Sequence, residues 1–171
     1  MSNNINKPEI EKFVKIIKDK PKEAKKAKRV EGEWIFKEGN PQFKSNLTFQ
    51  KSQITLECEL PPFAGGWGGA PDPVQYCLYG LAACYATTFA SSATMEGIIL
   101  DELRVIVESN MDMRKQMGVS KENIIEKMKF TVIVKSKASR EKLQTIKELA
   151  DKRCPGMECL TRPITVSTEL A

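Results

Sequence analysis

The sequence predicts an α+β fold in which antiparallel sheets wrap around a long buried central helix. Segments rich in β-branched and aromatic residues, with polar and apolar positions partly alternating, lie on both sides of the middle of the chain. Between them, residues 74–92 have a helical pattern that is apolar on nearly all sides, which is typical of a helix buried between other elements. The expected order of three strands, a helix, two strands, a helix and a strand is that of an α+β protein.

Residues 5–29 should form a basic amphipathic helix ahead of these elements. Apolar residues recur there at helical spacing, and Pro21 should break or bend the helix. The first 30 residues hold ten Lys and Arg against four acidic residues, a net charge of +6, so the other 141 residues sum to −1. We therefore expect two parts: residues 1–29 as a basic N-terminal helical extension, and residues 30–171 as the main domain.

The three strands before the central helix are expected to form an antiparallel meander, at residues 34–36, 43–49 and 54–60. A loop rich in Gly and Pro follows, and Asp72 or Pro73 begins the central helix, because Asp is a good N-cap and Pro fits the first turn. The elements expected after the central helix are strands at 100–108 and 128–135, a helix at 139–151, a turn at 154–156 and a last strand at 164–167.

The composition excludes several classes of protein. The chain has no histidine, which excludes Ser-His-Asp and Cys-His catalysis, zinc sites with imidazole ligands and haem with a proximal histidine. The five cysteines lack the close pairs of a four-cysteine zinc site, so we expect no metal and no cofactor. The longest apolar stretch is too short to cross a membrane and the first residues show no signal peptide, so we expect a cytoplasmic protein without membrane association.

Cys84 is the main candidate for thiol chemistry. It lies in the apolar central helix, where an inert core thiol is the simplest alternative, and that alternative also applies to Cys58 and Cys77. Cys154 and Cys159 lie in or near a Cys-Pro-Gly turn, where a thiol should be more exposed. A helical thiol and a nearby turn thiol suit peroxide reduction, because the first is oxidised to sulfenic acid and the second condenses with it to a disulfide. The sequence leaves open whether Cys154 or Cys159 would do so.

Two motifs resemble the signature of the OsmC/Ohr family. The first is a Gly-rich loop and a Pro-x-Pro that lead into a helix carrying a cysteine: Gly65-Gly66, then Ala70-Pro71-Asp72-Pro73-Val74-Gln75-Tyr76, then Leu81-Ala82-Ala83-Cys84. The second is a Cys-Pro after the last long helix: Ala150-Asp151-Lys152-Arg153-Cys154-Pro155. The resemblance covers roughly residues 30–170, and it is the order and separation of the two motifs that make it specific.

The resemblance implies an intertwined homodimer of α+β subunits, with the central helices packed against each other and the sheets outside. It also implies thiol-dependent reduction of organic hydroperoxides, as in an oxidative stress response. By this resemblance Cys84 is the peroxidatic catalytic residue, Cys154 is the resolving one, and a dithiol is the reductant. Residues 30–171 would then be an OsmC-like domain.

The chain departs from the family pattern at two positions that matter for activity. Peroxidases of the family have a Glu directly after the second Pro of Pro-x-Pro, where this chain has Val74, and they use an Arg that has no counterpart between Val30 and Cys84. Because a nearby cation or helix N-terminus is what lowers a thiol pKa, the alternative is a non-catalytic protein. It would bind a small apolar ligand in a pocket near Cys84, lined by Phe63, Trp67 and Tyr76.

Nucleic-acid contact through the basic segment Lys7–Arg29 is a third possibility, which we rank lowest. Ten basic residues would attract phosphates, but no aromatic residues alternate with the lysines to form a stacking platform. A solvated helix face is the simpler interpretation, so nucleic acid is not an expected partner.

Overall fold

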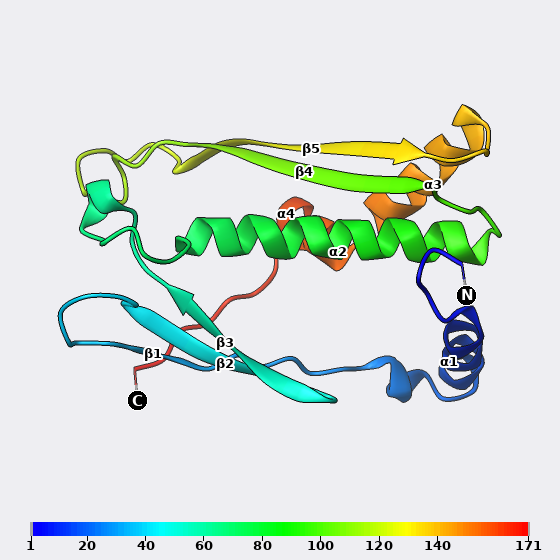
Figure 1. Ribbon diagram of the computed structural model, residues 1–171, viewed down its shortest axis with the longest axis horizontal. Helices are drawn as coiled ribbons and strands as arrows, with labels where there is room; N and C mark the ends of the chain where they lie inside the picture. The colour runs from blue at the N-terminus through cyan, green and yellow to red at the C-terminus, as the bar shows by residue number, and fades with distance from the viewer. Residues whose placement is uncertain (1, 171) are drawn as a thin grey trace. The chain divides into compact units, whose positions relative to one another are not determined.

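The structure is a computed structural model that describes residues 2–170. Its chain divides into two units, one formed by Met1–Glu11 and Leu78–Ala171, the other by Lys12–Cys77. Helices α1 (Lys7–Asp19) and α2 (Pro73–Met95) each begin in one unit and end in the other (Figure 1). The expected boundary at residue 29 stays a prediction.

The Lys12–Cys77 unit contains an antiparallel three-stranded sheet in the order β1-β2-β3, formed by Gly32–Trp34, Phe43–Phe49 and Ser52–Cys58. Strands β2 and β3 form a hairpin whose register runs from Phe49 opposite Ser52 to Phe43 opposite Cys58. The predicted meander is therefore confirmed, although β1 begins and ends two residues earlier than expected.

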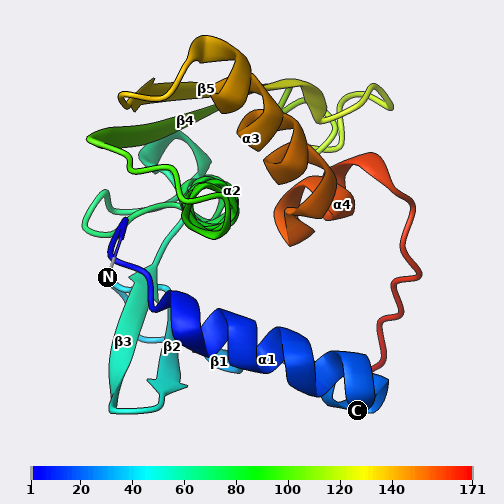
Figure 2. The same cartoon turned by 90° about the vertical axis from the view of Figure 1, so that its right-hand side faces the viewer.

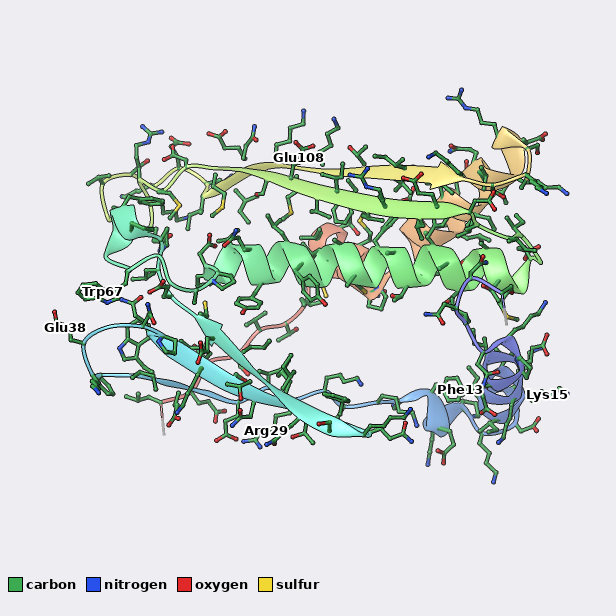
Figure 3. The ribbon with its side chains drawn as sticks, in the orientation of Figure 1. Phe13, Lys15, Arg29, Glu38, Trp67 and Glu108 are labelled. Atoms are coloured by element: carbon green, nitrogen blue, oxygen red, sulfur yellow. The ribbon has the colours of Figure 1, made fainter. Side chains whose placement is uncertain are left out.

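The other unit places an antiparallel pair of strands and a helix against the second part of α2. Strands β4 (Glu102–Met111) and β5 (Ile125–Lys135) pair along their length, and α3 (Arg140–Arg153) follows them (Figures 1 and 2). Ser139 caps α3 as predicted, its hydroxyl accepting from the N–H of Lys142. Alternate residues of β4 face outward, as the labelled Glu108 shows in Figure 3.

The core of this unit joins three elements. It contains Tyr85, Phe89 and Ala93 from α2, Ile146 and Ala150 from α3, and Cys154, and apolar residues of β4 and β5 pack against it. Burial of this apolar surface is the main favourable contribution to folding the unit. The α+β class with antiparallel sheets and a long apolar helix is confirmed.

Three sequence predictions are corrected. The N-terminal helix ends at Asp19, because Pro21 begins a short 3-10 helix, η1 (Pro21–Ala24), and residues 25–31 have no regular structure. The last strand predicted at 164–167 is absent, and residues 163–170 form no helix or strand. The turn predicted at 154–156 is instead the start of a further helix, α4 (Pro155–Thr161).

The central helix is buried only in part. Its buried residues lie in its second half, between Tyr85 and Thr94, whereas Tyr79 is 72% exposed. Across residues 2–170, no helix combines the length and the apolar character that crossing a membrane requires.

Candidate functional site

The structure brings Cys84 of α2 and Cys154 together. Their sulfur atoms lie 3.6 Å apart, with the Cys154 thiol donating to Cys84 Sγ, although the two residues are 70 positions apart in the chain. A disulfide needs the two sulfurs to close to about 2.0 Å, so a small movement suffices to join them. Both residues belong to the same unit of the fold.

Cys154 is more buried than the sequence suggested. It is 1% exposed, and it forms both the C-cap of α3 and the N-cap of α4. Pro155 fits the first position of α4, where a missing N–H costs nothing. The chain therefore passes from α3 into α4 at the Cys-Pro pair, and the Cys154 thiol is buried at this junction.

A hydrogen bond next to the two cysteines joins α2 to α3. The Tyr85 hydroxyl donates to Asp151 Oδ1 at 2.7 Å, and Lys147 Nζ pairs with Asp151 Oδ2 at 2.6 Å. Tyr85 follows Cys84 directly, and Asp151 lies one turn before Cys154. The contact therefore joins α2 to α3 close to both thiols.

Gly156 leaves the room that the pair needs. A Cβ added at Gly156 would lie 3.1 Å from Leu81 Cδ2 and 3.6 Å from both Cys84 Cβ and Cys154 Sγ. An added methyl group would require the end of the Leu81 side chain to shift by a few tenths of an ångström, and larger side chains would crowd both cysteines. The Cys-Pro-Gly sequence thus has a separate role for each of its three residues.

The environment of Cys84 favours the neutral thiol. Burial raises its pKa, the backbone N–H of Gly156 lowers it, and the neighbouring Cys154 and Cys159 raise it further, so the pKa lies above its ordinary value. Of these influences only one N–H favours the thiolate. Cys84 is also well beyond the first turn of α2, where the helix dipole would help.

The other three cysteines lie in different surroundings. Cys58 ends β3 and is partly buried, and burial together with the charges of Asp72, Glu59 and Cys77 raises its pKa. Cys77 is exposed, although the helix pattern suggested a core position. Cys159 is exposed on α4, as expected.

A buried carboxylate that the sequence analysis missed holds the Gly-rich loop. Glu59 is 2% exposed, and it accepts from the N–H of Trp67 at 3.1 Å, from that of Ala70 at 2.8 Å and from that of Gly69. Burial alone would raise its pKa, but these N–H groups, with that of Gly68, lower it overall. An acidic residue at the apolar end of a strand, just before a Gly-rich loop, is the signal that could have identified it.

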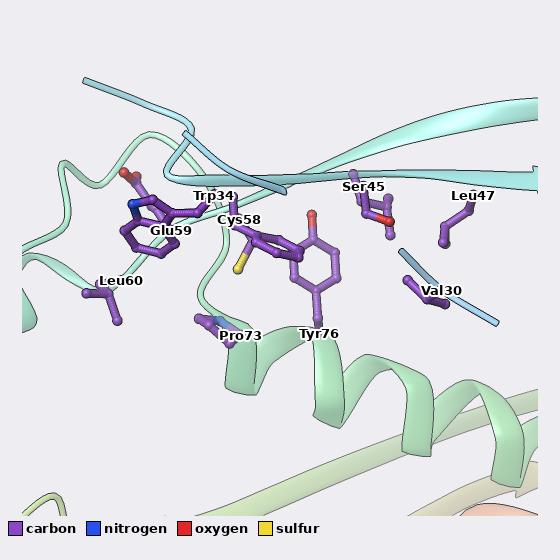
Figure 4. A pocket seen from close by; sticks show the side chains of 11 residues that line it. Val30, Trp34, Ser45, Leu47, Cys58, Glu59, Leu60, Pro73 and Tyr76 are labelled. Atoms are coloured by element: carbon purple, nitrogen blue, oxygen red, sulfur yellow. The ribbon is translucent and has the colours of Figure 1, made fainter. Parts of the chain in front are cut away.

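An apolar cavity of about 470 Å³ lies in the Lys12–Cys77 unit, between the inner face of the β1-β2-β3 sheet and the first turn of α2 (Figure 4). Tyr76 lines it, and its hydroxyl donates to the Glu57 carbonyl at 2.8 Å. Cys58 lines it too, whereas Phe63, Trp67 and Cys84 do not. Phe63 and Trp67, predicted to line a pocket, are 74% and 56% exposed, and Trp67 projects from its loop in Figure 3.

No group of three or more His, Cys, Asp or Glu side chains within residues 2–170 is arranged to hold a metal ion. Cys84 and Cys154 form a close pair of thiols, and thiols form covalent bonds with sulfur and oxygen.

Solved structures with the same fold include proteins from Mycoplasma pneumoniae and Legionella pneumophila. An OsmC-like protein from Mycoplasma pneumoniae is 19% identical, with a TM-score of 0.58 over 79% of this chain and 89% of that one. An organic hydroperoxide resistance protein OsmC from Legionella pneumophila is 18% identical, with a TM-score of 0.57 over 80% of this chain and 92% of that one. At these identities the likeness shows the fold. No protein with a curated functional description matches the chain.

The sequence itself matches a family model described as "OsmC-like protein" over residues 66–169, more than half of the chain. This segment includes the Gly-rich loop, α2 with Cys84, and the Cys-Pro that begins α4. The chain belongs to the OsmC-like protein family.

Proposed function

We propose that this protein is a cytoplasmic thiol-dependent peroxidase that reduces organic hydroperoxides through Cys84 and Cys154. The observation that carries the proposal is the 3.6 Å separation of the two sulfurs in a fold shared with hydroperoxide resistance proteins. Two thiols at this distance can form a disulfide after a small movement, and a reducing compartment would return the disulfide to the dithiol.

The reaction begins with the Cys84 thiolate, which attacks one oxygen of the hydroperoxide. The O–O bond breaks, the other oxygen leaves as the alcohol after taking a proton, and Cys84 becomes a sulfenic acid. The Cys154 sulfur then attacks the Cys84 sulfur, water leaves, and a disulfide forms. An external dithiol reduces this disulfide and is itself oxidised, which restores both thiols.

The raised pKa of Cys84 sets the rate of the first step. Because only the thiolate is nucleophilic, a small fraction of the protein reacts at neutral pH. We therefore expect the protein to reduce hydroperoxides slowly, at a rate that increases with pH. Val74, at the position where the family's peroxidases have a Glu, agrees with weak activation.

Turnover of cumene hydroperoxide with dithiothreitol tests the proposal directly. We expect wild-type protein to consume the peroxide and Cys84→Ser to lose this activity. Cys77→Ser is the matched control, since Cys77 is an exposed thiol on the same helix, and it should keep full activity. In a variant with both Cys154→Ser and Cys159→Ser, we expect one turnover followed by over-oxidation of Cys84. The absence of a trapped sulfenic acid at Cys84 under excess peroxide would reject the proposal.

We infer that the active form is a homodimer. The first half of α2 is apolar yet exposed, with Tyr79 72% exposed, and an exposed apolar surface of this kind is typical of an interface. Light scattering after size exclusion should give twice the chain mass of 19.2 kDa. A mass of one chain at micromolar concentration would contradict the inference.

A second candidate function is non-catalytic binding of a small apolar ligand, and two observations favour it. The raised pKa of Cys84 disfavours turnover, and the 470 Å³ cavity has an almost wholly apolar lining of a size suited to such a ligand. A fluorescent fatty-acid probe distinguishes the two functions. Binding that Leu56→Arg abolishes, with no peroxide consumption at pH 9, would favour the second function.

A further inference from the structure

Cys159 is a third thiol near the pair, on the side of α4 that Gly156 shares. Gly156 lies close to α2, because its missing Cβ would touch Leu81 and Cys84. Cys159 follows Gly156 by three residues, so the two lie on the same side of α4, about 4.5 Å apart along its axis. A charge on Cys159 also raises the pKa of Cys84, as expected of a neighbouring thiol.

The three thiols differ in their access to solvent. Cys154 is 1% exposed and Cys84 is partly buried, whereas Cys159 is exposed. In a disulfide between Cys84 and Cys154, a dithiol in solution could therefore reach only the partly buried Cys84 sulfur. Thiol–disulfide exchange requires the attacking sulfur to approach one of the two bonded sulfurs, so shielding slows reduction.

The helix that carries Cys159 is short enough to move. Helix α4 has seven residues, and a helix of this length is only marginally stable by itself. None of its residues is buried, and residues 163–170 beyond it form no regular structure. A displacement of α4 by about 4.5 Å along its own axis, which is the rise from Gly156 to Cys159, would bring Cys159 to the position that Gly156 now occupies.

We propose that Cys159 transfers the disulfide from the buried pair to the surface. The Cys159 thiolate attacks Cys84 Sγ, the Cys84–Cys154 bond breaks, and Cys154 leaves as a thiolate that takes up a proton. The new Cys84–Cys159 disulfide has one exposed sulfur. A dithiol attacks Cys159 Sγ to form a mixed disulfide, and Cys84 leaves as the thiolate that the next peroxide needs. The second sulfur of the dithiol then attacks the first, which closes the dithiol to its own disulfide and releases Cys159 as a thiolate.

This inference rests on the proposed function for its biological purpose, but its chemistry can be tested without a peroxide. Diamide oxidises thiol pairs directly, so we would treat Cys154→Ser and the variant with both Cys154→Ser and Cys159→Ser with diamide and map the disulfides by mass spectrometry. We expect a Cys84–Cys159 disulfide in the first variant and no disulfide to Cys84 in the second. Finding none to Cys159 in the first variant would overturn the proposal.

A kinetic experiment tests the transfer in the complete chain. Wild type, Cys159→Ser and the matched control Cys77→Ser are oxidised with diamide, and their reduction by dithiothreitol is followed by trapping free thiols. We expect Cys159→Ser to be reduced at least tenfold more slowly than wild type and Cys77→Ser to be unchanged. Equal rates for wild type and Cys159→Ser would overturn the proposal. Oxidation by diamide but not by cumene hydroperoxide would instead reject the peroxidase and leave the transfer standing.

Discussion

Glu59 and Cys84 are both partly or wholly buried groups that can carry a negative charge, and their surroundings act on them in opposite directions. At Glu59, the backbone N–H groups of Trp67, Gly69 and Ala70 point at one carboxylate, and its pKa falls. At Cys84, burial meets only the N–H of Gly156, and the pKa rises. Burial raises the pKa of each group, so the number of donors decides which one is held as an anion.

The difference separates a structural anion from a reactive one. Glu59 gains its donors from a loop whose glycines let the backbone turn its N–H groups inward, with Gly65 and Gly68 at positive φ. Such a fully satisfied carboxylate stabilises the loop and is not available for chemistry. Cys84 is mostly a neutral thiol. When it loses its proton, only the N–H of Gly156 lowers the pKa, so the thiolate is weakly stabilised and available for reaction.

Glu59→Gln tests the first half of the comparison, and we expect it to have the largest effect on stability. A Gln side chain presents an NH₂ group to N–H donors and leaves some of them unsatisfied, so the loop should open and the urea midpoint should fall. Glu57→Gln, at an exposed position two residues away in β3, is the matched control. It should change neither the loop nor the urea midpoint.

The pH dependence of folding follows from the same carboxylate. Because its folded pKa is lowered, the stability that Glu59 contributes is present above the ordinary carboxyl pKa of about 4.3 and is lost as the pH falls through the lower folded value. Acid unfolding of Glu59→Gln should therefore lack this component. An identical loss of stability with acid in both proteins would show that Glu59 is not held as an anion.

The rate of Cys84 oxidation tests the second half. Below its pKa, the thiolate fraction rises about tenfold per pH unit, so the rate with cumene hydroperoxide should rise about 100-fold from pH 6 to pH 8. Stopped-flow measurement of the Cys84 reaction in the variant with both Cys154→Ser and Cys159→Ser isolates this step. A rate that is already constant at pH 7 would mean that donors other than Gly156 stabilise the thiolate.

Gly156→Val should slow disulfide formation by moving the two thiols apart, without changing the charges around them. Its methyl groups would lie against Leu81 and both cysteines, so α4 must retreat, and we expect disulfide formation with diamide to slow by about tenfold, equivalent to about 1.4 kcal/mol. Thr161→Val, an exposed position on the same helix, is the control. An unchanged rate would show that the close approach of α4 is not needed.

Tyr85→Phe should have the smallest effect. It removes the hydroxyl that donates to Asp151, and a buried hydrogen bond to a charged group contributes about 1.5–3 kcal/mol to the free energy of unfolding. Lys147 remains beside Asp151 and should reduce this loss to about 1 kcal/mol. Urea unfolding measures it, with the exposed Tyr79→Phe as the control.

Much of the fold could be predicted from local patterns. Alternation identified the β2–β3 hairpin, the Ser139 N-cap marked the start of α3, and the apolar run marked α2. The strand expected at 164–167 failed because β-branched residues indicate a strand only where a partner strand exists to pair with it. The helix expected to continue to residue 29 failed because no packing compensates the interruption at Pro21.

The site depended on contacts that no local pattern contains. The family motifs pointed to Cys84 and Cys154, but the two come together through contacts between α2 and α3, such as that of Tyr85 with Asp151, which are 66 residues apart. Cys154 was expected on an exposed turn because Pro-Gly is common in turns, yet the chain continues as α4 and buries the thiol. Glu59 was missed because its partners are backbone N–H groups, which every sequence has.

Because Cys84 and Cys154 are far apart along the chain, the redox state of the pair should change the free energy of unfolding. Joining two residues that are 70 positions apart ties a long loop, and a loop of this length restricts the unfolded chain by an entropy equivalent to about 4 kcal/mol. Oxidation would thus make the chain harder to unfold, and reduction would return it to a more easily unfolded state. A protein that has just met an oxidant would then be protected from unfolding until its disulfide is reduced.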